Sequence, residues 1–338
     1  MRLGGGQLPY AGRGLLLSQP GQTYALRNEV RIWLAGGKSW SKMREMIASG
    51  ADARGPPLLF RVARGLIRNK VRGGYRLMDL VERHGMLNRL VNYPIGNGIS
   101  MRVPLWRPEN RWDRRDVMRY ESDLIACVGS RIRRPSVLID CGAEIGIFTM
   151  SLFARSGMIT RVIAIEPNPS CLEVLKANIA SLPVQAKVVS GAIGREPGWG
   201  TLSSPEQGTL EDALHMVSNA AGKTRVFTID QLDLSVEEAV VVKLDVEGWE
   251  GEAIRGAIST LMSHDFVLTV EANGAVYHRT KLDPCAILKL VPRIRDCKLV
   301  IAEAPGTPID LDRPFLEQFP QMMQRTLNVV VSHWTRMH

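Results

Sequence analysis

From residue 136 onward, the chain alternates short apolar runs with longer stretches that carry helical periodicity. The apolar runs occupy residues 137–142, 161–167, 186–191, 240–245, 266–271, 298–303 and 327–332. Helical patterns follow four of them, at residues 145–156, 169–182, 249–262 and 284–295. Near-continuous apolar strands that alternate with helices are typical of a parallel sheet covered on both faces. The sequence therefore predicts an α/β, doubly wound architecture, in which ligands bind at the carboxyl ends of the strands.

The first apolar run ends in "DCGAEIG", a glycine-containing turn of the kind that precedes a ligand-facing helix. Gly142 allows a tight turn, and Gly146 allows the next helix to pack closely. Glu144 stands where a dinucleotide site would need a second glycine, and Asp140 adds another negative charge. Two carboxylates suit a cationic or zwitterionic nucleoside, and S-adenosylmethionine carries both an ammonium and a sulfonium group. A purely structural tight turn is the alternative interpretation.

The second apolar run ends in an acidic residue, Glu166, which lies 20 residues after Gly146. At this spacing, doubly wound folds place the carboxylate that accepts hydrogen bonds from ribose hydroxyls. An ordinary exposed glutamate explains poorly why an otherwise apolar strand ends in this way. Asp140, Gly142, Gly146 and Glu166 together predict an adenosine-binding site.

The stretch "VVVKLDVEGWE", residues 240–250, places charges at the end of a strand that should be buried. Lys243 and Asp245 share one face of a strand, and Glu247 falls in the following turn. A buried Lys243 needs an anionic partner, most simply Asp245 or a glutamate of a neighbouring strand. We interpret these charges as a polar cluster beside a transferable methyl group. Glu271 ends the next strand, but nothing fixes an octahedral set of oxygen ligands, so we expect no metal.

The first 135 residues differ from the rest of the chain in charge. They hold 25 Lys and Arg against 10 Asp and Glu, a net +15, whereas residues 136–338 hold 18 against 24, a net −6. This asymmetry argues against a nucleic-acid binder and indicates two functional parts. We expect a flexible basic tail over residues 1–56 with a short helix near 39–49, a helical and hairpin cap over 57–134, and a cofactor-binding domain over 135–338.

The expected cap combines three helices with one hairpin. Helical patterns cover residues 58–71, 75–84 and 114–130, and an Asn-Gly turn at 97–98 separates two short strands. Four arginines follow one stripe of the first helix, namely Arg61, Arg64, Arg68 and Arg72. The stripe indicates either contact with an anionic membrane or an ordinary solvated face, and the solvated face is the favoured interpretation.

Cysteine usage and the lack of long apolar runs bear on the compartment. The five cysteines form no C-x-x-C pair, which argues against a disulfide framework or a zinc site and favours a reducing cytoplasm. No apolar run approaches the roughly 18 residues of a spanning helix. The apolar core of the first 20 residues is also too short for a secretory signal, so we expect a cytoplasmic protein.

Five segments, taken in order, resemble the FkbM family of S-adenosylmethionine-dependent methyltransferases. They are "DCGAEIG", "IEPNP", "TIDQL", "KLDVEGWEGEAIRGA" and "VEAN", and the resemblance covers roughly residues 136–273. It implies a class I methyltransferase (Rossmann-like) sheet, mostly parallel and seven-stranded, whose last strand, near 327–332, is antiparallel. It also implies that the turn from Asp140 to Gly146, with Ala143 and Glu144, lines the cofactor site and that Glu166 binds the ribose. Two departures are Glu144, where the family usually has Asn, and the long basic front.

The resemblance further implies an O-methyltransferase that acts on a hydroxyl, often of a sugar or a secondary metabolite. We expect a glycan, glycolipid or small-molecule acceptor, with a polyketide-like metabolite as the alternative. Asp245 is the first candidate for the base or for the group that orients the acceptor, Glu247 is the second, and Lys243 would hold the charge and position of Asp245. A nicotinamide-dependent oxidoreductase and a non-catalytic nucleoside-binding module are the competing functions.

Overall fold

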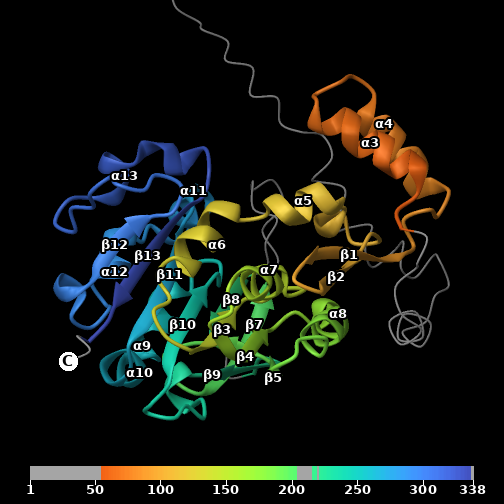
Figure 1. The fold of residues 1–338 in the computed structure, drawn as a ribbon. Coiled ribbons are helices and arrows are strands. Elements are labelled where there is room, and N and C mark those ends of the chain that lie inside the picture. The colour runs from red at the N-terminus through yellow and green to blue at the C-terminus, as the bar shows by residue number, and fades with distance from the viewer. Residues whose placement is uncertain (1–54, 204–214, 219–220, 336–338) are drawn as a thin grey trace, which may run out of the picture. The chain divides into compact units, whose positions relative to one another are not determined.

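The computed structural model describes residues 55–203, 215–218 and 221–335. Its centre is a seven-stranded sheet in the order β12-β13-β11-β10-β3-β4-β5 (Figure 1). Each of the seven apolar runs forms one of these strands, which confirms the predicted sheet. Their bounds are β3 Ser136–Cys141, β4 Ile159–Glu166, β5 Gln185–Ser190, β10 Ala239–Leu244, β11 Phe266–Ala272, β12 Lys298–Ile301 and β13 Leu327–His333.

The strand directions are those of a doubly wound fold. β3 pairs in parallel with β4 and with β10, and the parallel pairing continues from β4 to β5 and from β10 to β11. β13 runs antiparallel to both β11 and β12, as expected. The chain leaves β3 toward β4 on one side and later returns to β10 on the other. The topological switch point therefore lies between β3 and β10, and a crevice forms there at the carboxyl ends of the strands.

Helices cover both faces of this sheet, and residues of β10 are buried in a separate core on each face. Val241 packs into the core that includes α7 (Ile147–Arg155) and α8 (Pro169–Ile179). Val240 and Val242 pack into the core that includes α9 (Glu250–Arg255), α10 (Ile258–Ser263) and α12 (Pro284–Leu288). The apolar run before Lys243 is thus a strand buried on both faces.

Three predicted helices are shorter or more broken than their sequence pattern indicates. The helix expected over 114–130 is two helices, α5 Arg114–Arg119 and α6 Ser122–Gly129, and Glu121 lies between them in the left-handed region at φ 42°. The helix expected over 284–295 ends as α12 at Leu288. The helix expected over 249–262 is interrupted between α9 and α10.

The break between α9 and α10 has a visible cause. The backbone N–H of Asp230 donates to the carbonyl of Gly256, and the Asp230 carboxylate accepts from the N–H groups of Ser259 and Thr260 at 3.0 and 2.7 Å. A carboxylate that binds the first N–H groups of α10 acts as an N-cap supplied from elsewhere in the chain. This tertiary contact ends α9 and starts α10.

The region before β3 contains the predicted helices and hairpin. α3 (Leu58–Arg68) and α4 (Gly74–Arg83) precede the antiparallel pair of β1 (Leu90–Gly96) and β2 (Ile99–Pro104), whose turn contains Asn97 and Gly98, both at positive φ. Buried residues of α3, α4 and the hairpin belong to the same apolar core as α7 and α8. The helix expected near 39–49 lies outside the described residues.

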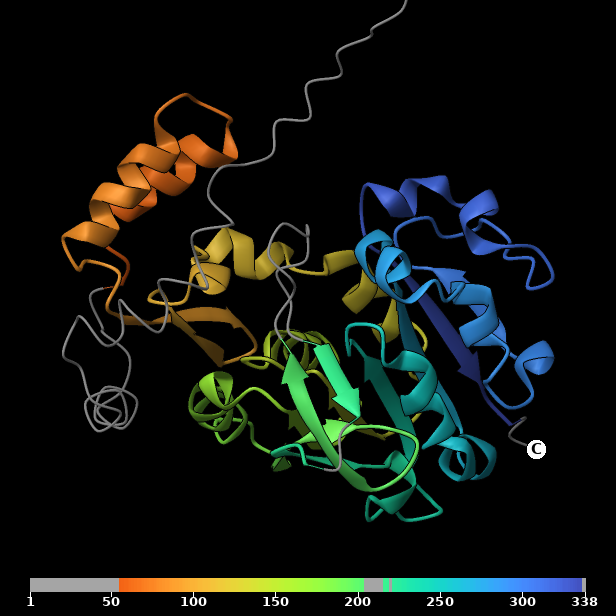
Figure 2. The ribbon, with the colours of Figure 1, turned by 180° about the vertical axis from the view of Figure 1, so that it is seen from behind.

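A second, four-stranded sheet was not anticipated from the sequence. It has the order β6-β9-β7-β8 and follows β5 in the chain (Figure 2). Its strands are β6 Ala192–Ile193, β7 Gly198–Ser203, β8 His215–Ser218 and β9 Thr224–Phe227. The remaining elements are η1 Pro108–Asn110, η2 Ile229–Gln231, α11 Gly274–Thr280, η3 Ile294–Asp296, α13 Phe315–Gln318 and η4 Pro320–Met323. None of the described helices is long and apolar enough to cross a membrane.

Candidate active site

The turn after β3 packs directly against the end of β10. Gly142 has φ 81°, and the N–H groups of Gly142 and Ala143 donate to the carbonyl of Ile165 at 2.9 and 3.1 Å. A Cβ atom on Gly142 would lie 1.9 Å from the carbonyl oxygen of Asp245. Gly146, at φ 86°, similarly allows the turn to approach α8, because an added Cβ would lie 3.1 Å from a methyl carbon of Leu175. Both glycines are therefore needed for the geometry that joins β3, β10 and α8.

Glu166 is held in place by two backbone N–H groups. Its Oε2 accepts from the N–H of Glu144 at 2.7 Å, and its Oε1 accepts from the N–H of Asn168 at 2.7 Å. Burial raises the pKa of Glu166 to about 7, although these two hydrogen bonds act in the opposite direction. Each carboxylate oxygen keeps a second lone pair, so the fixed side chain can still accept hydrogen bonds from a ligand.

Asp140 is fully buried beside the turn. Its Oδ2 accepts from the hydroxyl of Thr149 at 2.5 Å, and its Oδ1 has no hydrogen-bond partner among the described residues. Asp140 is the register partner of Lys243 on the neighbouring strand. Burial raises the pKa of Asp140, and the nearby Lys243 ammonium opposes that rise.

Glu144 contacts two residues, Asn110 and Arg107, that no sequence pattern identified as candidates. Asn110 donates from Nδ2 to Glu144 Oε1 at 2.9 Å, and the Arg107 guanidinium lies 3.6 Å from the same oxygen. Arg107 also donates to the Ser170 hydroxyl at 3.0 Å and to Cys171 Sγ at 2.7 Å. The segment that follows β2 therefore spans the turn after β3 and the start of α8. The negative charge of Glu144, the departure from the family pattern, has a cationic neighbour here.

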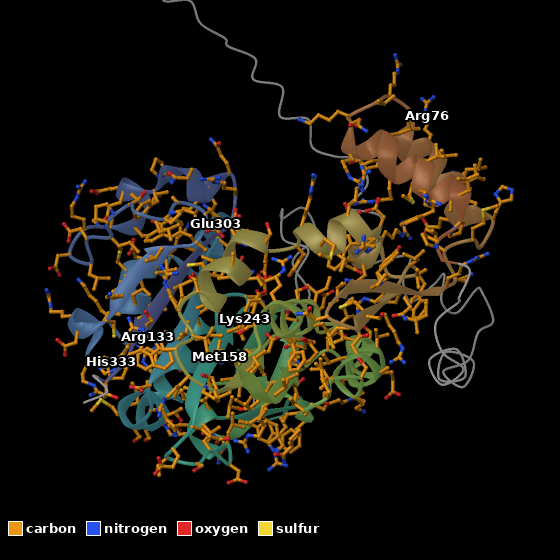
Figure 3. The ribbon with its side chains drawn as sticks, in the orientation of Figure 1. Arg76, Arg133, Met158, Lys243, Glu303 and His333 are labelled. Carbon is orange, nitrogen blue, oxygen red and sulfur yellow. The ribbon has the colours of Figure 1, made fainter. Side chains whose placement is uncertain are left out.

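Lys243 has the partner that its burial requires. Its ammonium lies 2.6 Å from Asp245 Oδ2, 3.9 Å from Glu121 Oε2 and 5.3 Å from the ring centroid of Phe148. Figure 3 labels Lys243 in the interior of the molecule. Burial alone would raise the pKa of Asp245, but the charge of Lys243 and a hydrogen bond with Glu271 hold it below the ordinary value. The predicted Lys243–Asp245 pair is confirmed, and it leaves Asp245 ionised.

A pocket of about 430 Å³ opens beside this pair. One wall comes from the junction of α5 and α6, and the other walls come from the strand ends and the chain before and within β13. The lining residues are Arg119, Tyr120, Glu121, Ser122, Asp123, Leu124, Asp245, Glu247, Glu271, Glu303, Thr326 and Asn328. Polar and charged groups therefore surround the space next to Asp245.

Three carboxylates lie close together in this pocket. Oxygens of Asp245, Glu247 and Glu271 lie within 4.8 Å of one another, a spacing that a metal ion could bridge. Lys243 already places a positive charge on Asp245. Burial and the charge of Asp245 raise the pKa of Glu271 well above its ordinary value, which opposes the build-up of three full negative charges here. The expected absence of a metal stays a prediction.

A comparison with protein-family models identifies the family of the domain that contains this site. Residues 140–304 match the family model described as "Methyltransferase FkbM domain". These residues form an FkbM methyltransferase domain. This domain contains the turn after β3, Glu166, Lys243, Asp245 and Glu271. Arg107, Asn110, Glu121 and β13 lie outside the matched residues.

The chain is also similar to individual proteins. The chain is 29% identical over 198 residues, 58% of this chain and 77% of the other, to "Hexuronic acid methyltransferase AglP" of Haloferax volcanii. It is similar to the crystal structure of an FkbM methyltransferase of Methylobacillus flagellatus KT, with 20% identity, a TM-score of 0.35 and coverage of 59% of this chain and 44% of that chain. It is also similar to the plantazolicin methyltransferase BpumL in complex with a monoazolic desmethylPZN analog and SAH, with 10% identity, a TM-score of 0.35 and coverage of 66% of this chain and 91% of that chain.

Proposed function

We propose that the protein is an S-adenosylmethionine-dependent O-methyltransferase whose acceptor is a hydroxyl of a sugar, either free, in a glycan or in a glycolipid. The observation that carries the proposal is the polar pocket of about 430 Å³ that opens at Asp245, next to the turn of the FkbM domain. A pocket of this volume lies within the range of small-molecule sites. It opens at Asp245, directly after β10, and β10 borders the switch point where a doubly wound fold binds ligands.

The residues of the turn fit the cofactor chemically. When bound, S-adenosylmethionine supplies a methyl group on a positively charged sulfur. Glu166 offers a fixed carboxylate for ribose hydroxyls, and Asp140 Oδ1 is buried without a hydrogen-bond partner among the described residues. Glu144 adds a carboxylate that is about one-third exposed. We assign cofactor binding to Asp140, Gly142, Ala143, Glu144, Gly146 and Glu166.

On the acceptor side, the main role falls to Asp245. Lys243 fixes the Asp245 carboxylate through the 2.6 Å contact and keeps it ionised, so it can accept a hydrogen bond from the acceptor hydroxyl and orient it. Glu247 lines the same pocket and is the second candidate for this role. Holding the hydroxyl in line with the transferable methyl group supplies much of the expected rate acceleration.

Two observations support a sugar over other acceptors. The pocket offers carboxylates, an amide and hydroxyls, which suit a molecule with several hydroxyl groups. The relative AglP is named for the methylation of a hexuronic acid. A hydroxyl of a secondary metabolite is the alternative acceptor, and it would need apolar lining that is sparse here, since Leu124 and Tyr120 are the apolar or aromatic side chains among the lining residues.

Two experiments test this function. Isothermal titration with S-adenosylhomocysteine and with NAD⁺ should show binding of the former alone, and binding of NAD⁺ alone would refute the cofactor assignment. A transfer assay with radiolabelled methyl donor should then be run against uronic acid, neutral and amino-sugar glycosides, glycolipids and a set of polyketide alcohols. Label on a sugar hydroxyl supports the acceptor class, and label confined to the polyketide alcohols would replace it.

The basic stripe of α3 is partly used within the protein. Arg64 lies 2.7 Å from Asp116, and Arg68 pairs with Asp113, both at the start of α5. We propose that residues 57–134 act as a cap on a methyltransferase domain at 135–338, and that any contact with anionic lipid rests on Arg61 and Arg72, which stay exposed. Co-sedimentation with anionic and neutral vesicles tests this contact, and equal binding to both would remove it. A cytoplasmic location fits the five free cysteines.

A further inference from the structure

Glu121 occupies an unusual place between two short helices. The N–H of Tyr120 donates to the carbonyl of Asp116 and ends α5, while the N–H of Ile125 donates to the carbonyl of Glu121 and starts α6. Glu121 itself has φ 42°, a backbone conformation that residues other than glycine seldom adopt. This break between α5 and α6 changes the direction of the chain, and residues 119–124 line the pocket at Asp245.

Among the described carboxylates that line the pocket, Glu121 has a buried oxygen that remains available for a ligand. Its Oε2 is buried, lies 3.9 Å from the Lys243 ammonium, and has no hydrogen-bond partner among the described residues. Asp245 Oδ2, by contrast, is bound to Lys243 at 2.6 Å. Both oxygens of Glu303 accept from Asn328, each at 2.8 Å. A buried acceptor oxygen without a donor costs free energy unless a ligand satisfies it.

The surrounding charges set Glu121 and Asp245 apart as acids. Burial raises the pKa of Glu121 to about 7, the Lys243 ammonium on β10 opposes this, and the charges of Asp245, Asp140 and Glu303 reinforce it. Lys243 instead holds the pKa of Asp245 below its ordinary value. A base works best when its pKa lies near the working pH, and two carboxylates with separated pKa values commonly divide the roles in one site.

We propose that Glu121, supplied by the cap, is the general base that accepts the proton of the acceptor hydroxyl, while Asp245 orients that hydroxyl. The proposal rests on the O-methyltransferase function given above. The hydroxyl O–H bond breaks and its proton moves to Glu121 Oε2. The oxygen forms its new bond to the transferred methyl group, and the electrons of the broken carbon–sulfur bond remain on sulfur. Glu121 then returns the proton to water at the open side of the pocket.

The division of roles has a structural consequence. Glu121 lies 19 residues before the first residue that the FkbM family model matches, whereas Lys243 and Asp245 lie inside the match. Lys243 touches both carboxylates and so couples the base to the group that orients the acceptor. The cap therefore contributes a catalytic group, besides covering the core.

The decisive experiment compares Glu121→Gln, Asp245→Asn and wild type on the sugar that wild type methylates best. Asp79→Asn, an exposed carboxylate on α4, is the matched control. We expect Glu121→Gln to lower kcat by about 100-fold or more, with an unchanged dissociation constant for S-adenosylhomocysteine and an unchanged melting temperature. Asp79→Asn should keep wild-type kcat.

The pH profile separates a base from a structural residue. Wild-type kcat at saturating cofactor should rise with pH to a plateau with a midpoint near 7, because Glu121 must lose its proton to act. Glu166 titrates in the same range, and the pH dependence of S-adenosylhomocysteine affinity reports it separately. The rise should vanish in Glu121→Gln and persist in Asp245→Asn. A fluorinated acceptor with a more acidic hydroxyl should recover part of the lost rate in Glu121→Gln.

Several outcomes would overturn the proposal. One is a folded Glu121→Gln that keeps kcat within about threefold of wild type. Another is loss of the rise near pH 7 in Asp245→Asn alone, which would make Asp245 the base. If Glu121→Gln does not fold, Glu121→Asp replaces it, and an unchanged profile with full kcat despite the shortened side chain would also count against the base role. A wild-type protein that binds no S-adenosylhomocysteine or methylates no hydroxyl would refute the proposed function itself, before any variant is compared.

Discussion

Replacing Lys243 by methionine should destabilise the protein more than any surface charge change. Lys243 is 3% exposed and lies 2.6 Å from Asp245, whose side chain is 22% exposed, so the substitution leaves a partly buried carboxylate without its cation. Two unit charges about 4 Å apart interact by about 4 kcal/mol at an effective dielectric constant of 20. Removing one partner of a buried ion pair costs about 3–5 kcal/mol. We expect the free energy of unfolding to fall by that amount, a large fraction of a typical total of about 5–15 kcal/mol.

Urea denaturation of four proteins measures this loss. They are wild type, Lys243→Met, Asp245→Asn and the double variant, and the m value should stay constant across them. The double variant should recover much of the loss, because a neutral pair replaces a lone buried charge. Lys176→Met is the matched control, since Lys176 is 54% exposed and pairs with Glu173 at 3.4 Å. Such a surface pair contributes about 0–1 kcal/mol.

The result that would refute the reasoning is specific. If Lys243→Met costs no more than Lys176→Met, or if the double variant loses the sum of the two single losses, then Lys243 and Asp245 are not coupled. A second readout follows from the same geometry, because the Lys243 ammonium lowers the pKa of Glu121. Its removal should move the midpoint of the pH–rate profile above that of wild type.

Three further predictions concern the turn after β3, Glu166 and metal dependence. Gly142→Ala should reduce the melting temperature sharply, because the added Cβ would lie 1.9 Å from the Asp245 carbonyl oxygen and the left-handed backbone adds about 1–2 kcal/mol of strain; an unchanged melting temperature would contradict the packing. Glu166 has its folded-state pKa raised to about 7 from 4.5, so its contribution to stability is present below pH 4.5 and lost as pH rises through 7. Wild type should therefore lose about 3 kcal/mol more than Glu166→Gln between pH 5 and 8 by urea denaturation, and parallel pH profiles would refute this. Dialysis against EDTA should leave methyl transfer unchanged, because Lys243 already supplies the positive charge beside Asp245; activity restored only by Mg²⁺ would show a metal at the carboxylates.

The large sheet could be predicted because each of its strands carries its own signal. An apolar run of six or seven residues, bounded by a turn, needs little information from the rest of the chain to be recognised. The Lys243–Asp245 pair could also be predicted, since a buried ammonium must have an anionic partner and Asp245 faces the same way. Glu166 ends an otherwise apolar strand, and a carboxylate at that position needs hydrogen-bond donors. Two backbone N–H groups supply them.

The parts of the site that come from the cap could not be predicted. The apolar spacing of residues 117–128 continues through Glu121 as though one helix ran across it, and only the structure places the break there. Glu121 and Lys243 are 122 residues apart, and no local pattern indicates that they meet. Asn110 and Arg107 likewise reach Glu144 through the packing of the hairpin on α7 and α8. The small sheet has strands too short and too polar to produce a recognisable run.

The position of β13 has a consequence for how the chain acquires its fold. β13 lies between β11 and β12 in the sheet, although both are synthesised before it. Until β13 inserts, β12 has no strand to pair with in the large sheet, and one edge of β11 presents unpaired N–H and C=O groups. Open strand edges of this kind promote association between incomplete chains. We expect pulse-labelled hydrogen exchange during refolding to protect β12 no earlier than β13, and earlier protection of β12 would contradict this order. A nascent chain that has exposed β12 but not β13 is therefore the species in which a chaperone would be needed most.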